Sequence, residues 1–142
     1  MKLILILAAL ALPFIPHPAN SAEAYLGLKT YHFDRGGRDC LNEEHHLIAY
    51  KQNGYTMGTY ENSQCERSYL VGNSYNIGNG FGIDMSLVTG YPKAMHIVKG
   101  ITLIPMITYT QYWGRIGFKS IMVPSVLVGI GAAIKFWHKK AP

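Results

Sequence analysis

The feature that most constrains this chain is an alternation of apolar residues with small or polar ones at a period of two. It is clearest over residues 81–91, where one face carries Phe81, Ile83, Met85 and Leu87. The other face carries Gly82, Asp84, Ser86 and Gly90. Successive side chains of a strand point to opposite faces, whereas a helix would place its apolar residues three and four apart. We therefore expect a barrel strand with its apolar face toward lipid and Asp84 toward the inside.

Turn signals divide the rest of the chain into further segments of this kind. The expected strands are 26–33, 44–52, 55–62, 67–77, 80–91, 101–112, 115–124 and 126–136. Short connections, such as Asn53-Gly54, alternate with longer ones at 34–43, 63–66 and 92–100, whereas Pro124-Ser125 is short for its place. Short periplasmic turns and longer outer loops are typical of outer-membrane barrels. The pattern predicts an all-β fold, an eight-stranded antiparallel transmembrane β-barrel.

Composition agrees with a wall that faces lipid. The chain is 49% hydrophobic but only 15% charged, whereas a soluble domain is about a quarter charged. The apolar content excludes disorder, and the basic residues form no stripe that would bind nucleic acid. The alternative is an inner-membrane protein with helices near 101–112 and 120–136. Alternation and interrupting prolines argue against those helices.

The first 22 residues are typical of a secretory signal peptide. Lys2 precedes an apolar run of about ten residues, and small residues follow it. Two cleavage sites are open, Ala19-Asn20-Ser21 and Ala22-Glu23-Ala24, and the alternative is an uncleaved anchor. We expect residues 1–22 to be removed, and residues 23–142 to form one exported barrel domain.

Export places the two cysteines, Cys40 and Cys65, in an oxidising compartment. On the expected topology they lie in the first and second outer loops, so a Cys40–Cys65 disulfide would join those loops. The alternative is two free thiols. Neither residue has a spacing typical of a metal site, and we expect none.

Aromatic residues fall mostly near the ends of the expected strands, which indicates interfacial girdles. Those considered are Tyr25, Tyr31, Tyr50, Tyr55, Tyr60, Tyr69, Tyr75, Tyr91, Tyr109, Tyr112, Trp113 and Trp137. The alternative is the general preference of aromatic residues for strands.

A candidate catalytic site lies at the outer rim of the barrel. His32 ends the first expected strand, and Asn62 and Ser63 end the third. A serine hydroxyl needs a neighbouring base, for which histidine is the usual residue. His45 and His46 are successive residues of a strand, so they cannot both line one site.

These residues resemble motifs of the lipid A palmitoyltransferase (PagP) family, and the similarity runs over nearly all of the mature chain. Thr30-Tyr31-His32 resembles the family's Thr-Trp-His, and Leu41-Asn42-Glu43 resembles its Tyr-Asn-Glu. Asn62-Ser63 falls where the family has a catalytic Asp-Ser, and Leu70-Val71-Gly72 follows at matching spacing. Residues 86–90, 103–106 and 122–124 resemble segments of its fifth, sixth and seventh strands.

The resemblance implies an outer-membrane enzyme that moves an acyl chain from a phospholipid onto lipid A, without a cofactor. His32 would act as the base, and Ser63 would lie beside the reacting group. Ser74 stands at the floor of the acyl pocket. We expect membrane lipids as the partners and a monomer as the functional unit.

Two prolines have a physical reading of their own. Proline cannot donate a hydrogen bond to a sheet ladder, and Pro105 and Pro124 lie toward the outer ends of adjacent expected strands. Together they predict a gap in the wall, through which the family admits phospholipid from the membrane. The alternative is two tolerated prolines at a sheet edge.

The chain also departs from the family. Asn62 replaces an aspartate and cannot stabilise a protonated histidine by charge. The prolines that flank a second gap of the family are replaced by Gly27 and His45. The alternative function is therefore a non-enzymatic small barrel that binds lipid or modifies the cell surface.

Overall fold

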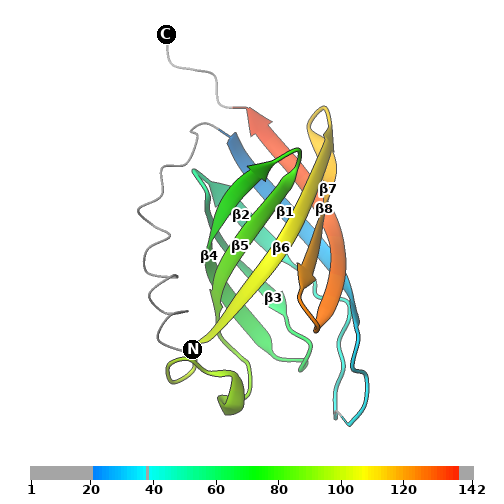
Figure 1. The fold of residues 1–142 in the computed structure, drawn as a ribbon, viewed down its shortest axis with the longest axis vertical. Helices are drawn as coiled ribbons and strands as arrows, with labels where there is room; N and C mark the ends of the chain where they lie inside the picture. The colour runs from blue at the N-terminus through cyan, green and yellow to red at the C-terminus, as the bar shows by residue number, and fades with distance from the viewer. Residues whose placement is uncertain (1–20, 38, 138–142) are drawn as a thin grey trace.

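Eight antiparallel strands close into one barrel in chain order, with β8 pairing back onto β1 (Figure 1). The computed structural model describes residues 21–37 and 39–137. The strands are β1 (Ser21–His32), β2 (Ile48–Gln52), β3 (Tyr55–Glu61), β4 (Arg67–Gly78), β5 (Phe81–Val88), β6 (Thr102–Trp113), β7 (Ile116–Val123) and β8 (Leu127–Trp137). The predicted all-β fold, a closed barrel of eight antiparallel strands, is confirmed.

Three strand boundaries differ from those expected by more than one residue: the starts of β1 and β2, and the end of β5, which lies at Val88 rather than at residue 91. β1 begins at Ser21, within the predicted signal peptide, whose residues 1–20 lie outside the described part of the chain. Ala22 pairs with Gln52 on one side and Phe136 on the other, and these partners extend the strand. β2 begins at Ile48 rather than at residue 44. The reason is that residues 43–47 run alongside a bulge in β1 and bond to it outside the regular ladder.

The connections at the two ends of the barrel differ in length, as predicted. Tight turns join β2 to β3, β4 to β5 and β6 to β7 at the upper end in Figure 1. Longer loops, 33–47, 62–66 and 89–101, lie at the lower end. The β7–β8 connection, 124–126, is the short exception at that end.

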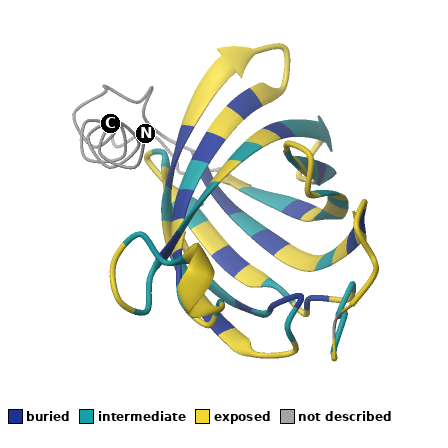
Figure 2. Ribbon diagram, turned by 60° about the horizontal axis from the view of Figure 1, so that its bottom comes forward, coloured by how far each residue is buried: buried dark blue, intermediate teal, exposed yellow. Residues whose placement is uncertain are grey.

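The wall has an apolar outside and a smaller or polar inside. In β5, Phe81, Ile83 and Leu87 are exposed, whereas Asp84 and Ser86 are buried. The same alternation is visible along the other strands (Figure 2). The inward direction predicted for Asp84 is therefore confirmed.

The alternative of two membrane helices is wrong, because residues 101–112 and 120–136 lie mainly in β6, β7 and β8. The one helix within 21–37 and 39–137 is a single 3-10 turn at Lys93–Met95. In this described part, no helix is long and apolar enough to cross a membrane.

The aromatic prediction holds for only part of its set. Tyr31, Tyr69 and Trp113 are exposed on the outside, as a girdle requires. Tyr25 and Tyr60 are buried, so the prediction is wrong for them. Both side chains line an interior cavity, because their strand positions have inward parity.

The predicted disulfide between Cys40 and Cys65 is confirmed, with the two Cα atoms 6.2 Å apart. It ties the β1–β2 loop to the β3–β4 loop across 25 residues of chain. Closing a loop of that length stabilises a fold by about 3 to 4 kcal/mol in the chain-entropy account.

Candidate functional site

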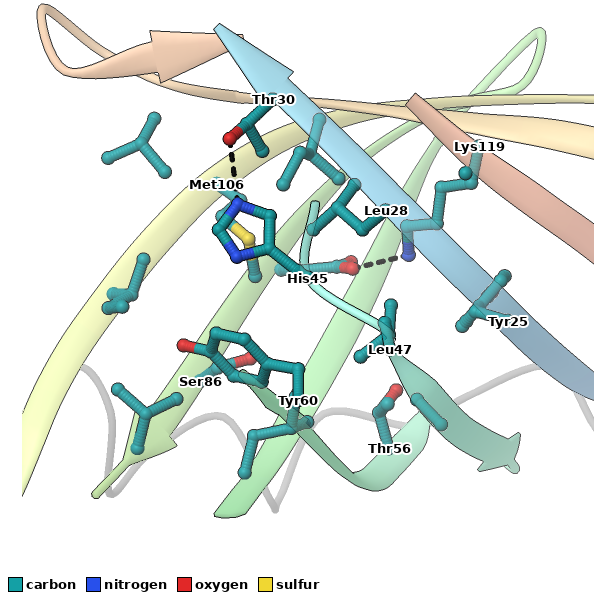
Figure 3. Close-up of a pocket in the computed structure, with 18 of the residues that line it drawn as sticks. Tyr25, Leu28, Thr30, His45, Leu47, Thr56, Tyr60, Ser86, Met106 and Lys119 are labelled. Carbon is teal, nitrogen blue, oxygen red and sulfur yellow. Dashed lines mark hydrogen bonds and ion pairs between the residues drawn. The ribbon is translucent and has the colours of Figure 1, made fainter. Parts of the chain in front are cut away.

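The loop end of the barrel contains a mostly apolar cavity with a volume of about 120 Å³. Its wall comes from all eight strands and the loops beside them. Figure 3 shows part of this lining. The apolar residues that line it include Leu28, Leu47, Ala49, Leu70, Val88, Ile104, Met106, Ile121, Val123 and Leu127. Such a lining suits a hydrocarbon group better than a polar ligand.

A buried ion pair lies at the inner end of this cavity. Lys119 Nζ is 2.5 Å from Asp84 Oδ2, and both side chains are about 10% exposed. The same ammonium lies 4.4 Å from the centre of the Tyr25 ring. Ser74, Asp84 and Lys119 also line a second cavity of about 260 Å³ at the turn end. The charged floor therefore separates the apolar cavity from a polar one.

The second cavity carries the remaining interior charges. Lys51 Nζ lies 3.8 Å from Glu23 Oε2, and the Tyr25 hydroxyl donates a hydrogen bond to the same carboxylate. Lys135 Nζ lies 5.3 Å from the centre of the Tyr112 ring. This arrangement fills the turn end with paired polar groups, so a hydrocarbon chain would be held in the loop-end half.

The outer end of the apolar cavity has a polar rim, which we call the mouth. It consists of Thr30, His45, Tyr60, Ser63 and Tyr91. The Tyr60 and Tyr91 hydroxyls are 2.9 Å apart. Burial raises the pKa of the Tyr91 hydroxyl above its ordinary value.

A bulge in β1 turns Thr30 and His32 inward, and His32 belongs to the predicted catalytic site. Pairing of β1 with β8 shifts between Leu26 and Lys29, where Gly27 takes a φ of +59° in the left-handed region that favours glycine. Before the bulge Tyr25 faces inward, and after it Thr30 and His32 do. The bulge thus reverses which residues of β1 face the cavity.

His45 is the histidine that lines the cavity. Its Nε2 is 2.7 Å from Thr30 Oγ1, and its Nδ1 is 2.7 Å from the main-chain oxygen of Glu61. Burial lowers its pKa. The exposed side chain of His46 points elsewhere, which confirms that the two successive histidines do not share a site.

His32 is also buried, but it is absent from the residues that line the cavity. Its Nδ1 lies 3.5 Å from Glu43 Oε1, and its main-chain N–H donates to the same oxygen at 3.0 Å. That N–H, with Arg35, holds the pKa of Glu43 below its usual value. The His32 and His45 rings are 6.4 Å apart between centres.

Asn62 organises the β3–β4 loop from a fully buried position. Its amide nitrogen donates to Ser68 Oγ and to the Gly90 carbonyl, at 2.9 and 2.8 Å. Its amide oxygen accepts from the N–H groups of Gln64 and Glu66. These four bonds use the whole capacity of the amide.

The structure places the three predicted catalytic residues differently. Ser63 lines the cavity, His32 lies beside the mouth, and Asn62 lies in the loop behind it.

The wall between β6 and β7 is incomplete at the loop end. Pairing stops at Ile107 with Met122, although β6 continues to Thr102 and stays paired with β5 over that length. The same register, continued, would set Pro105 opposite Pro124. Neither residue can donate a ladder hydrogen bond, and the chain turns into β8 at Pro124.

The corresponding position between β1 and β2 is bonded instead. The N–H of Gly27 donates to the Leu47 carbonyl and the N–H of His45 to the Leu28 carbonyl, both at 2.8 Å. A further bond joins Thr30 N–H to the Glu43 carbonyl at 2.9 Å. The family's second gap therefore has no counterpart at Gly27 and His45.

The residue pair that sequence reasoning missed is Thr30 with His45. The two are 15 residues apart, and their contact depends on the bulge. One signal was present, since Thr30 lies two residues before His32 and therefore on the same face of the strand.

No protein-family model matches the chain, and no curated protein sequence matches it. Over residues 21–37 and 39–137, no three His, Cys, Asp or Glu side chains are grouped as a metal site requires.

Proposed function

We propose that this chain is an outer-membrane β-barrel that takes an acyl chain of a membrane lipid into its interior. In its finer form, the proposal is transfer of that chain from a phospholipid to lipid A or a related envelope acceptor. The observation that carries it is the apolar cavity, with a buried ion pair at its inner end and a polar mouth at its outer end.

The outside of the barrel supports a membrane location. Large apolar side chains are exposed on strands all around the wall, among them Ile48, Met57, Val71, Ile83 and Ile130. Exposed apolar surface on this scale is costly in water. A lipid-facing band with polar groups inside is the arrangement of outer-membrane barrels.

The break between β6 and β7 supports sideways access from the membrane. Ile104, Met106 and Val123 line the cavity beside this break. An acyl chain that passed between Pro105 and Pro124 would therefore reach the apolar lining without crossing the polar mouth.

Acyl transfer rests on the resemblance and on the groups at the mouth. Ser63 supplies a hydroxyl at the cavity. The ring of His32 lies 6.4 Å from that of His45, which belongs to the mouth. A hydroxyl and a base within reach of an ester are the groups that acyl transfer requires.

A second candidate, a non-enzymatic barrel that binds lipid, is favoured by Asn62. Its amide donates to the Gly90 carbonyl, and a carboxylate at the same place could not donate there. The residue that replaces the family's aspartate is therefore matched to a loop rather than to a histidine.

Mass spectrometry of lipid A from cells with and without the protein tests the finer proposal. We expect a mass gain of one acyl chain, which Ser63→Ala or His32→Ala reduces and the control His46→Gln leaves unchanged. Equal gain with both alanine variants would contradict these residue roles. A folded barrel that binds a fluorescent fatty acid but adds no mass supports the second candidate.

A further inference from the structure

We propose that Thr30 and His45 form a nucleophile–base pair, in which the Thr30 hydroxyl accepts an acyl chain from a lipid ester. The inference rests on the proposed binding of an acyl chain in the cavity. It differs from the roles that the resemblance gives to Ser63 and His32.

The hydrogen bonds of His45 define its tautomer. A main-chain carbonyl can only accept, so the Nδ1 atom that lies 2.7 Å from the Glu61 oxygen must carry a proton. In the neutral ring Nε2 then has a lone pair, and Thr30 Oγ1, 2.7 Å away, must be the donor. This is the geometry of a base poised to remove the hydroxyl proton.

The surroundings keep His45 in the form that the role needs. The residue is only 3% exposed, and burial lowers its pKa, which favours the neutral ring at neutral pH. His32, Glu43 and Glu61 are the charged or titratable groups that act on it, and Tyr60 packs edge-on at 6.0 Å. The ring is therefore held in place by a carbonyl, a hydroxyl and an aromatic side chain.

The pair stands where a lipid ester would come to lie. Both side chains line the cavity, with Leu28 and Met106 beside them (Figure 3). A hydrocarbon chain seated on the apolar lining would place its carbonyl group at the mouth. Thr30 is fixed there by its main-chain bond to Glu43.

The proposed reaction has two balanced steps. Thr30 Oγ1 attacks the ester carbonyl carbon while its proton passes to His45 Nε2. The bond from that carbon to the glycerol oxygen breaks, and the proton on Nε2 passes to the departing oxygen, which leaves as an alcohol. In the second step an acceptor hydroxyl gives its proton to Nε2 and attacks the acyl-threonine ester. The bond from the acyl carbon to Thr30 Oγ1 breaks, so that the acyl chain passes to the acceptor and the proton on Nε2 returns to Thr30.

Labelling with a long-chain alkyl fluorophosphonate tests the assignment in the intact protein, folded in detergent micelles. The probe forms a phosphorus–oxygen bond to an activated hydroxyl and releases fluoride, and peptide mass spectrometry locates the bond. We expect the label on Thr30. His45→Gln should reduce the labelling rate by about 100-fold or more, as loss of a general base does.

Matched variants separate a reacting hydroxyl from a structural one. Thr30→Val keeps the shape and should abolish the label, whereas Thr30→Ser should retain it on the new hydroxyl. The control His46→Gln, at an exposed residue outside the cavity lining, should leave the label on Thr30 in place. The labelling rate should also rise with pH. Because the pKa of His45 is lowered, the midpoint of this rise should lie below 6.5, the ordinary pKa of histidine.

Binding of a fluorescent fatty acid by the same samples distinguishes the two proposals. Binding with no label, or with the label on Ser63, would overturn this inference and leave the proposed lipid binding intact. No binding by the folded wild-type barrel would overturn both.

Discussion

At the scale of single residues, the barrel is organised by polar groups that face inward in a wall whose outside is apolar. Asp84 and Lys119 form the floor of one cavity, and His45 and Thr30 stand at its mouth. Each of these groups has a partner within 3 Å. Buried polar groups are tolerated only when they are paired in this way.

Removing one charge of the Asp84–Lys119 pair should destabilise the barrel more than replacing both residues with apolar ones. Asp84→Asn leaves a buried ammonium without its counter-ion, which costs about 3 to 5 kcal/mol. The double variant Asp84→Leu, Lys119→Met should recover most of that loss, because no charge is left unpaired. Urea unfolding in micelles measures both values. A single variant that costs less than about 1 kcal/mol would contradict the pairing.

His45 predicts a pH dependence of stability. Its pKa is lower in the folded protein than in the unfolded chain, so the unfolded chain takes up the proton first as pH falls. The free energy of unfolding should therefore decrease as pH falls through about 6.5, the ordinary value. Unfolding midpoints between pH 8 and pH 5 measure the slope.

The matched control for this slope is the neighbouring histidine. His45→Gln should flatten the dependence, whereas His46→Gln should not, because His46 is exposed. Glu43 is expected to add a loss only at more acidic pH, since its pKa is lowered. Equal slopes in the wild type and His45→Gln would show that His45 is not the group responsible.

At the scale of elements, strand pairing is irregular at two places near the loop end, besides a register shift between β4 and β5 beside their turn. β1 contains a bulge whose neighbour, residues 43–47, still bonds to it. Between β6 and β7, pairing stops short of the end of β6. The first irregularity sets which residues face the cavity, and the second leaves the wall unpaired beside it.

Closing the wall between β6 and β7 should block lipid access. Met106 and Val123 follow the last paired residues and would be opposite each other in the same register. A cysteine at each position should form a disulfide that slows fatty-acid uptake from vesicles, and reduction should restore the uptake. The wild-type protein, whose native disulfide is reduced equally, is the control. Uptake that is unaffected by the cross-link would place the access route elsewhere.

At the scale of the whole molecule, the barrel reverses the arrangement of a soluble domain, with its large apolar side chains outside. This surface predicts that stability depends on lipid. In a bilayer, Val71→Lys on the outside of β4 should cost about 2 to 4 kcal/mol. Phe33→Lys, also exposed but in a loop beyond β1, should cost much less. Folding titrations in vesicles compare the two variants. A cost for Val71→Lys of no more than about 0.5 kcal/mol would contradict the prediction, because a surface in water gives a change of that size.

The sequence by itself determined the number of strands, the alternation of short and longer connections, the disulfide and the inward direction of Asp84. These features are local, because a period of two and turn residues are read within about ten positions. The disulfide followed from the order of the loops. Asn62 illustrates the limit, because its amide nitrogen donates to Ser68 in β4 and to Gly90 in the β5–β6 loop, positions that no local pattern connects to it.

Only the tertiary structure decided which side chains meet inside the barrel. The bulge at Gly27 reverses the facing of Thr30 and His32, and a strict alternation through β1 would have placed both outside. Thr30 meets His45 across 15 residues and Asp84 meets Lys119 across 35. Such contacts depend on the register between strands, and a shift of one residue moves every side chain of a strand to the opposite face.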